Sequence, residues 1–525
     1  MRVLGVEGTA WAASAAIYDD DADRVTQFSE AYQPDSGGLH PREAAEHMRE
    51  HIPAVIEAAI AAAEGPIDAV AFSRGPGLGP CLRVAASAAR SAALTLDVPL
   101  AGVNHMVAHL EVGRQGADFA RPVCLNASGA NAHVLALHNG RYRVLGETVD
   151  TGVGNAIDKF ARHLGWGHPG GPKVEARAAD GEWLDLPYVV KGMDFSFAGI
   201  TSAAQDAVED GAPVADVCFS LQETVFAMLT EVAERALALT GSDELVLGGG
   251  VGQNERLQAM LTEMCAARGA QFHAPDPEYL RDNGGMIAML GARMVAAGST
   301  LSVEESAVRP DFRPDQVPVT WRTADERGPV ATGTHRQGAE AAVTLDGETV
   351  TKRRASKTYR HPALDERLRQ RRTVNEARLT AAARREGVPT PVVFDVDRQR
   401  HQLILEEVGD ADLQDALTLP RVRAAADSLA TLHDAGYVHG DPTTRNVRVD
   451  TASHDRVILI DFGLGYHSRD VEDFAVDLHV FNQSLAGTAS DPTAALEAAR
   501  EAYADAGDAV VLDRLDTVAG RGRYQ

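Results

Sequence analysis

Cysteine and long apolar runs are scarce in this chain of 525 residues. Its four cysteines lie far apart and show no C-x-x-C spacing, which excludes a zinc ribbon and gives no basis for a disulfide framework. No charge-free apolar stretch of about 18 residues occurs, so a membrane-spanning helix is not expected. The first residues include Glu7 and no long apolar core, so they are not typical of a signal peptide. We therefore expect a reduced, soluble protein of the cytoplasm with no membrane partner.

Lysine is also scarce, because only five of the 50 basic residues are Lys, while the net charge is −25. A strongly acidic surface has the wrong sign for general binding to nucleic-acid phosphates. It suits instead a cytoplasm held at very high salt, where repulsion between like charges is screened. A lysine that persists in such a chain indicates a site that needs a compact point charge instead of a planar guanidinium.

A strand–turn–strand pattern occurs twice in the first part of the chain, over residues 2–18 and 122–137. Helical stretches and further strand-like runs follow each copy. The repeat predicts a duplicated α/β unit with a cleft between its halves. Prolines then interrupt a polar stretch between 309 and 335, which is typical of a linker. We predict an α/β region over 1–320, a linker over 321–334 and an α+β domain over 335–525.

Three glycine-rich loops, at residues 5–9, 128–131 and 248–254, occupy corresponding places in this duplicated unit. Glycine lets backbone N–H groups approach an anionic oxygen, although a tight turn explains any single one of these loops. Their corresponding positions favour a site for phosphate or nucleotide. The chain has no G-x-x-x-x-G-K-[ST] motif, which excludes a P-loop.

His105 and His109 are four residues apart in a helical stretch, so their side chains share one face and are able to bind one metal ion. Two partly buried histidines without a ligand are the simpler interpretation. The three residues between them are apolar, so the glutamate of an H-E-x-x-H zinc protease is missing. Asp282 is the best candidate for a third ligand, which would complete an open site of two histidines and one carboxylate.

Six motifs together resemble the universal tRNA threonylcarbamoyltransferase family over residues 1–320. They are Val6–Ala10, Asn104–His109, Gly154–Phe160, His168–Glu175, Asp194–Phe197 and Arg281–Gly284. The resemblance implies a duplicated actin-like, Hsp70-type (ASKHA) fold. It also implies direct transfer of a threonylcarbamoyl group from threonylcarbamoyl-adenylate to tRNA. The acceptor would be N6 of the adenine 3′ of the anticodon, in tRNAs that decode ANN codons.

The same resemblance implies which residues hold the metal and the donor. His105, His109 and Asp282 would bind the metal. Threonylcarbamoyl-adenylate would contact Asn126, Ala127, Ser128, Gly129, Ala130, Asp158, Gly171, Glu175 and Asn254. Two positions depart from the family, because Asn126 replaces its usual tyrosine and Ala130 replaces its usual second glycine. Iron is the metal of the family, and the loss of the tyrosine phenolate leaves zinc or a water ligand open here.

The last third of the chain carries the spacing of a protein kinase's phosphoryl-transfer centre, H-x-D-x4-N followed by D-F-G. Asp441 would accept the proton, while Asn446 and Asp461 would bind magnesium. Lys352 would contact the ATP phosphates and pair with Glu376. The complete set disfavours a degenerate pseudokinase. No Ala-Pro-Glu follows the D-F-G, so the usual peptide-docking segment is missing.

Residues 357–365 and 439–446 resemble the small atypical, RIO-like kinase of the KEOPS complex, and the match extends over 335–525. The resemblance implies Mg-ATP binding at a reduced glycine loop of Gly338, Ala339 and Glu340. It also implies an ATPase, with Ser/Thr kinase activity, that supports the transferase together with small KEOPS subunits. Two alternatives stay open: a metallopeptidase fused to a signalling Ser/Thr kinase, and an assembly scaffold that only senses nucleotide.

Residues 352–372 contain nine Lys or Arg and only two acids. One interpretation is a solvated helix face. The other is a track for the tRNA backbone, together with Arg521 and Arg523 near the end of the chain.

Overall fold

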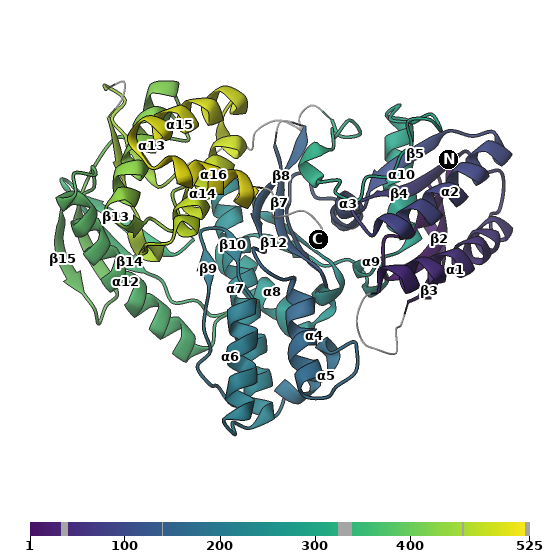
Figure 1. The fold of residues 1–525 in the computed structure, drawn as a ribbon, viewed down its shortest axis with the longest axis horizontal. Helices are drawn as coiled ribbons and strands as arrows, with labels where there is room; N and C mark the ends of the chain where they lie inside the picture. Colours follow the sequence, from purple (N-terminus) through teal and green to yellow (C-terminus); the bar gives the residue numbers. More distant parts are fainter. Residues whose placement is uncertain (33–39, 139, 324–338, 454–455, 520–525) are drawn as a thin grey trace.

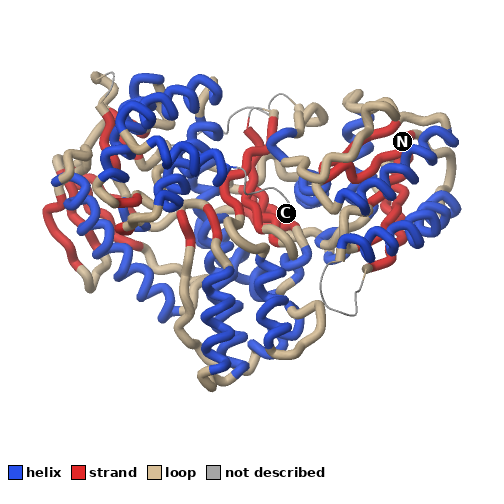
Figure 2. The backbone as a smooth tube through the Cα atoms, viewed as in Figure 1, coloured by secondary structure: helices blue, strands red, loops and turns tan. Residues whose placement is uncertain are grey.

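Figures 1 and 2 show the computed structural model, which describes residues 1–32, 40–138, 140–323, 339–453 and 456–519. The first part of the chain forms two α/β lobes, and the C-terminal part packs against the second lobe (Figure 1). Within the described ranges, no helix is long and apolar enough to cross a membrane.

The first lobe is built on a five-stranded sheet in the order β3-β2-β1-β4-β5. Its strands are β1 (Arg2–Glu7), β2 (Ala12–Asp19), β3 (Arg24–Ala31), β4 (Ala69–Gly75) and β5 (Leu100–Asn104). The first three pair antiparallel, and β4 and β5 add in parallel. Helices cover both faces of the sheet. One face packs against α1 (Pro41–Ala61) and α2 (Gly79–Leu96), and the other packs against α3 (His105–Ala117) and α10 (Gly284–Ala296).

The second lobe repeats this sheet, in the order β12-β11-β6-β7-β8. Its strands are β6 (Val123–Ala127), β7 (Ala132–His138), β8 (Arg141–Glu147), β11 (Glu244–Gly248) and β12 (Gln271–His273). Again three strands pair antiparallel and two add in parallel, so the predicted duplication is confirmed. Its main helices are α4 (Val153–His163), α5 (Gly171–Ala178), α6 (Ala198–Glu209), α7 (Val214–Thr240) and α8 (Glu255–Arg268).

Helix α7 is the longest element, with 27 residues, and nearly every side chain between Ala215 and Leu237 is buried. A helix buried all round needs partners on every side. One side of α7 packs in the core of the second lobe, and polar residues near its C-terminal end meet the C-terminal part. Helix α7 therefore joins the two parts of the molecule.

The C-terminal part begins with a four-stranded antiparallel sheet in the order β13-β14-β16-β15. Its strands are β13 (Ala341–Asp346), β14 (Thr349–Arg354), β15 (Val393–Asp397) and β16 (Gln402–Glu406). The helices that follow or flank it are α12 (Pro362–Arg385), α13 (Leu419–Asp434), α14 (Val471–Thr488), α15 (Pro492–Ala506) and α16 (Ala509–Ala519). The observed order agrees with the predicted α+β arrangement.

The proline-containing stretch after residue 309 packs on the first two lobes over its described length. Phe312, Val317 and Val319 are buried, and the Val319 N–H donates to the Gly140 carbonyl over 2.8 Å. Most of the predicted linker, residues 324–334, lies outside the described residues.

Candidate functional site

Three predicted metal ligands converge where the first lobe meets the second. Helix α3 begins at His105, and Asn104 caps it by accepting a hydrogen bond from the Val107 N–H over 3.1 Å. One helical turn separates His105 from His109, so their rings meet edge to face with centroids 4.9 Å apart. Asp282 enters from the turn before α10, and its Oδ1 lies 3.3 Å from His105 Nε2 and 3.4 Å from His109 Nε2.

This spacing fits one ion. Ligand atoms bound at about 2.0–2.2 Å in a tetrahedral shell lie about 3.4 Å from one another. Both histidines are buried, and the Asp282 side chain is 20% exposed, so one side of the cluster stays open. With no metal, the carboxylates of Glu7 and Asp282 outweigh burial and raise the pKa of His105 to about 10. A bound cation would therefore displace protons from this cluster.

Glu7 supports the cluster from behind, a role not predicted from the sequence. Its Oε2 lies 3.0 Å from His105 Nδ1, while its Oε1 accepts hydrogen bonds from the N–H (2.8 Å) and hydroxyl (2.6 Å) of Thr9. The signal in the sequence was an acidic residue directly after the apolar run Val3–Val6, and the structure shows that its carboxylate is fully buried. A carboxylate behind a histidine fixes which ring nitrogen faces the metal.

Replacing Glu7 with glutamine should lower metal affinity by about 10- to 100-fold, because the imidazole loses its anionic partner. A competitive titration against a chelator measures this effect. Glu57→Gln, on the exposed face of α1, is the matched control and should leave the affinity unchanged. Equal affinities in the two variants would contradict the supporting role of Glu7.

The loop after β6 lies beside the metal cluster. A Cβ built on Gly248 would lie 3.2 Å from Asn126 Oδ1 and 3.6 Å from the Cβ of His109, which places Asn126 next to this histidine. Asn126 is fully buried, and its Oδ1 has no hydrogen-bond partner among the described residues. A buried oxygen without a partner at this position suits a site that is completed by a ligand.

The same loop is tied to helix α4. The Gly154 N–H donates to the Ser128 carbonyl over 3.2 Å, and the Asn155 N–H donates to the Gly129 carbonyl over 2.8 Å. Gly154 must be glycine for this approach, since a Cβ would lie 2.7 Å from the Cα of Gly129. Ala130 does not adopt a positive φ, so the alanine is accommodated without strain.

The remaining predicted donor residues surround this loop on the second lobe. Asp158 on α4 accepts a hydrogen bond from the Gly170 N–H over 2.7 Å and contacts His168 Nδ1 at 3.1 Å. Glu175 on α5 accepts from the Glu255 N–H over 3.0 Å. Asn254 caps α8 and donates to Gln222 Oε1 over 3.2 Å. Gly171 faces open space.

The predicted kinase residues also converge. Lys352 on β14 lies 2.8 Å from both Glu376 Oε1 on α12 and Asp461 Oδ1. Asn446 Nδ2 donates to Asp441 Oδ2 over 3.0 Å. All five residues line one cavity of about 520 Å³, in which Ala339 and Glu340 also take part, while Gly338 lies outside the described residues.

The pKa values of the two aspartates in this cavity are shifted in opposite directions. Burial raises the pKa of Asp441 to about 6, despite the nearby guanidinium of Arg235. Lys352 and Arg354 outweigh burial at Asp461 and lower its pKa to about 2. A carboxyl with a raised pKa suits proton acceptance, and one that stays ionised suits a cation ligand.

The basic run 352–372 has a different role from either interpretation made from the sequence. Seven of its nine basic residues form ion pairs with acids: Lys352, Arg354, Lys357, Arg360, Arg367, Arg369 and Arg372. Four of these residues, Lys357, Arg360, Arg367 and Arg372, reach acids of the second lobe. These four residues therefore help to hold the two parts of the molecule together. Arg521 and Arg523 lie outside the described residues.

Glu231 on α7 is the centre of this contact. It is buried and pairs with Arg235 (2.7 Å), Arg360 (2.6 Å) and Arg372 (2.9 Å). Arg235 in turn lies 2.8 Å from Glu340 and 3.9 Å from Asp441, so a residue of the second lobe forms part of the wall of the 520 Å³ cavity. The interface and the predicted ATP site thus share one set of charges.

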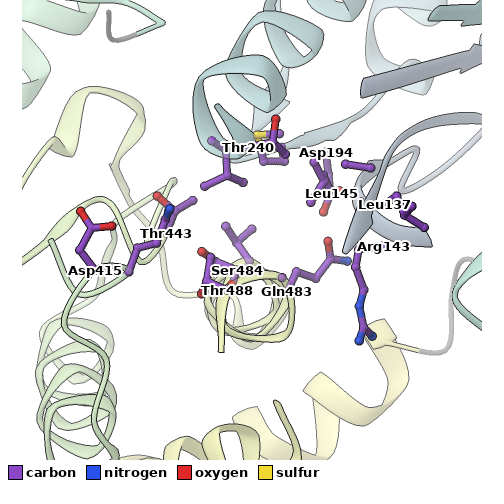
Figure 3. A pocket seen from close by; sticks show the side chains of 16 residues that line it. Leu137, Arg143, Leu145, Asp194, Thr240, Asp415, Thr443, Gln483, Ser484 and Thr488 are labelled. Atoms are coloured by element: carbon purple, nitrogen blue, oxygen red, sulfur yellow. Dashed lines mark hydrogen bonds between the residues drawn. The ribbon is translucent and has the colours of Figure 1, made fainter. Parts of the chain in front are cut away.

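A second cavity, of about 220 Å³, lies between the second lobe and α14 (Figure 3). Thr240 and Asp194 line it from the lobe, and Gln483 and Ser484 line it from α14. Burial and the neighbouring Glu147 raise the pKa of Asp194 to about 8. The Asp194 carboxyl accepts a hydrogen bond from the Glu147 N–H over 2.9 Å.

The fold and the metal cluster together indicate the class of enzyme to which the two lobes belong. Two duplicated lobes, with a His–His–carboxylate cluster and a glycine-containing loop between them, are the frame of an actin-like group-transfer enzyme, here joined to a second α+β part. A family model described as tRNA N6-adenosine threonylcarbamoyltransferase matches residues 23–289. The chain belongs to this family and acts in the threonylcarbamoyladenosine modification of tRNA.

Relatives match over the whole chain, including the C-terminal part. A "Probable bifunctional tRNA threonylcarbamoyladenosine biosynthesis protein" of Halobacterium salinarum is 68% identical over 100% of this chain and 99% of its own length. A protein with the same description from Haloarcula marismortui is 61% identical over 100% of this chain and 100% of its own length. Another, from Methanospirillum hungatei, is 50% identical over 99% of each chain. These relatives support the predicted fusion and give no support to the metallopeptidase alternative.

Proposed function

We propose that the two lobes transfer threonylcarbamoyl from threonylcarbamoyl-adenylate to N6 of the adenine 3′ of the anticodon in ANN-decoding tRNAs. The observation that carries this proposal is the convergence of His105, His109 and Asp282 beside the loop 126–130. Asp158, Gly171, Glu175 and Asn254 would hold the adenylate on the second lobe. Small KEOPS subunits would act as partners.

The chemistry needs a polarised carbonyl and a stabilised leaving group. A metal held by the three ligands would supply Lewis-acid polarisation. The Ser128 N–H already donates to the Asn131 carbonyl. The backbone N–H groups of Gly129 and Ala130 would bind the phosphate of the departing AMP. N6 bonds to the carbonyl carbon, the bond from that carbon to the phosphate oxygen breaks, and N6 loses a proton. The Ser128 hydroxyl donates to the Asn131 carbonyl over 3.0 Å, which leaves it poorly placed as a nucleophile and favours direct transfer.

Two imidazoles and a carboxylate suit both iron and zinc. Asn126, which replaces the tyrosine of the family, offers a neutral amide oxygen at the same place. Metal analysis of the protein as purified decides between the two ions.

The C-terminal part is proposed to be an atypical, RIO-like kinase fold that acts on Mg-ATP. Lys352, oriented by Glu376, would contact the phosphates, Asn446 and Asp461 would hold magnesium, and Asp441 would accept the proton. The Glu340 side chain is occupied by Arg235, Arg354 and Arg372, so the loop would contact ATP through its backbone. ATP hydrolysis is expected to be the main activity because the peptide-docking segment is missing.

The proposal is tested with the full chain at high salt, unmodified ANN-decoding tRNA and threonylcarbamoyl-adenylate, with and without small KEOPS subunits. Mass spectrometry of the digested tRNA should show threonylcarbamoyladenosine. If neither reaction gives product while ATP is still hydrolysed, the chain itself is not the transferase and the scaffold alternative is favoured.

Asp461→Ala should abolish ATP hydrolysis, because Asp461 is proposed to hold magnesium. Adenylate binding by the lobes should stay unchanged, because the ion pairs of Asp461 are with Lys352 and Arg354 of the C-terminal part. Phosphate release and calorimetry with a non-hydrolysable adenylate measure the two effects. Asp513→Ala, on the exposed face of α16, is the control. Loss of adenylate binding in Asp461→Ala would show that the sites are not separate.

A further inference from the structure

Two aromatic rings, one from each lobe, stack on one another. The ring centroids of Trp11 and His168 are 5.0 Å apart, and their planes differ by 14°. Trp11 lies in the turn between β1 and β2 of the first lobe, and His168 lies before α5 of the second. Both side chains are partly exposed, so ring surface remains available to a ligand.

This pair lies between the two halves of the proposed reaction centre. Thr9, two residues before Trp11, places its hydroxyl 3.5 Å from Asp282 Oδ2 of the metal cluster. His168 contacts Asp158, a proposed donor residue, at 3.1 Å. The two rings therefore lie close both to the metal cluster and to the proposed donor residues.

We propose that Trp11 and His168 form the stacking site for the acceptor adenine of tRNA, an inference that rests on the donor placement proposed above. The base lies in a single-stranded loop, where unstacking it costs little, and every base has a π face that an aromatic ring can cover. The two rings come from different lobes. When the two lobes move apart, the two rings separate. The adenine then lies against the indole, with N6 on the side of the metal cluster.

Charges near the pair indicate the side from which RNA approaches. Two of the five lysines, Lys159 on α4 and Lys173 on α5, are exposed on the second lobe, and Lys173 Nζ donates to the Gly167 carbonyl beside His168 over 2.6 Å. On the other side, the ring of Tyr32 lies beside Trp11, and the ring of His47 lies beside Tyr32. Four carboxylates flank those outer rings, namely Glu30, Glu43, Glu46 and Glu50. Phosphates are thus favoured beside the lysines and disfavoured beside the outer rings.

The test uses an anticodon stem-loop RNA with adenine at the modified position and the same RNA with an abasic site there, at one fixed salt concentration. Trp11→Ala should raise KM for the stem-loop by about 10- to 100-fold, the range expected for one lost base stack. kcat and calorimetric adenylate affinity should change by less than about twofold if the residue only binds the base. Trp11→Phe should restore most of the KM, because phenylalanine keeps a ring.

Fluorescence supplies a reading that a purely structural role would not change. The adenine-containing stem-loop should quench tryptophan emission, while the abasic RNA, or Trp11→Phe with either RNA, should not. Trp183→Ala is the matched control, because Trp183 also stacks on a histidine, His361, with centroids 4.6 Å apart, but at the contact with the C-terminal part. Equal quenching by the abasic RNA, or an unchanged KM in Trp11→Ala, would overturn the proposal. If the unaltered chain does not bind the adenylate, the proposed placement of the donor is wrong instead.

Discussion

Replacing His109 with alanine is expected to reduce tRNA modification by at least about 1000-fold, because the metal supplies several kcal/mol of stabilisation to the polarised carbonyl. The variant loses one of three ligands, and the Asp282 carboxylate then faces His105 alone. Metal content, measured by mass spectrometry of the purified protein, should fall in parallel with the rate. The ATP hydrolysis proposed for the C-terminal part should keep its rate, since no residue of the metal cluster is among those that line the cavity around Lys352.

His163→Ala is the matched control for this experiment. His163 lies on α4, is partly exposed and pairs with Glu209 at 3.6 Å. Its loss should change neither metal content nor rate. A His109→Ala protein that modifies tRNA at the normal rate without metal would contradict the proposed chemistry.

Replacing Glu231 with glutamine is expected to destabilise the contact between the lobes and the C-terminal part by about 3–5 kcal/mol, the usual cost of breaking a buried ion pair from one side. The change leaves three buried guanidinium groups, those of Arg235, Arg360 and Arg372, without their shared carboxylate. Denaturant unfolding, followed by fluorescence, measures the loss. Because the pairs are buried, high salt should weaken the effect only slightly.

Glu64→Gln is the control, because Glu64 pairs with Arg24 where both side chains are more than half exposed. An exposed pair contributes about 0–1 kcal/mol and is screened by salt. An equal change in both variants would show that Glu231 does not hold the interface.

The pH dependence of this contact has a definite sign. Burial opposes ionisation of Glu231, but Arg372, Arg235 and Arg360 outweigh it and hold its pKa below the ordinary value of 4.5. A depressed carboxyl pKa contributes stability above its unfolded value and loses it as the pH falls through the folded value. The interface should therefore be intact at neutral pH and weaken in acid. Glu231→Gln should reduce this acid dependence without abolishing it. Glu340 pairs with Arg235 and Arg372 at the same contact, and these arginines, with Arg354 and Arg360, outweigh burial and hold its pKa well below the ordinary value.

Much of the fold was predictable because its signals are local. The strand–turn–strand repeats of residues 2–18 and 122–137 correspond to β1–β2 and β6–β7, and the duplication follows from them. The four-residue spacing of His105 and His109 predicts one shared face, as observed. Spacing alone did not identify Glu7 behind His105, because the two residues are 98 positions apart.

The basic run 352–372 shows the limit of local reasoning most clearly. Its charge of +7 gives the same pattern in sequence whether the partners are phosphates, water or acids of another domain. The tertiary structure decides among these, because Glu231 and Glu234 lie on α7, more than 100 residues earlier. Burial then forces pairing, since an unpaired guanidinium in the interior would be too costly.

The sequence by itself determined which kinds of chemistry to expect of this protein. Local motif spacing indicates the His105–His109 pair, the glycine-containing loop after β6 and the kinase-like motifs that contain Asp441 and Asp461, because each motif depends on residues close together in the chain. Asp282 lies 173 positions after His109, so spacing alone did not place it. Only the tertiary structure decided how these sites are joined: Glu7 behind His105, Arg235 in the wall of the 520 Å³ cavity, and Trp11 against His168 of the other lobe. These contacts connect separate elements, and the packing that brings such elements together depends on the whole chain.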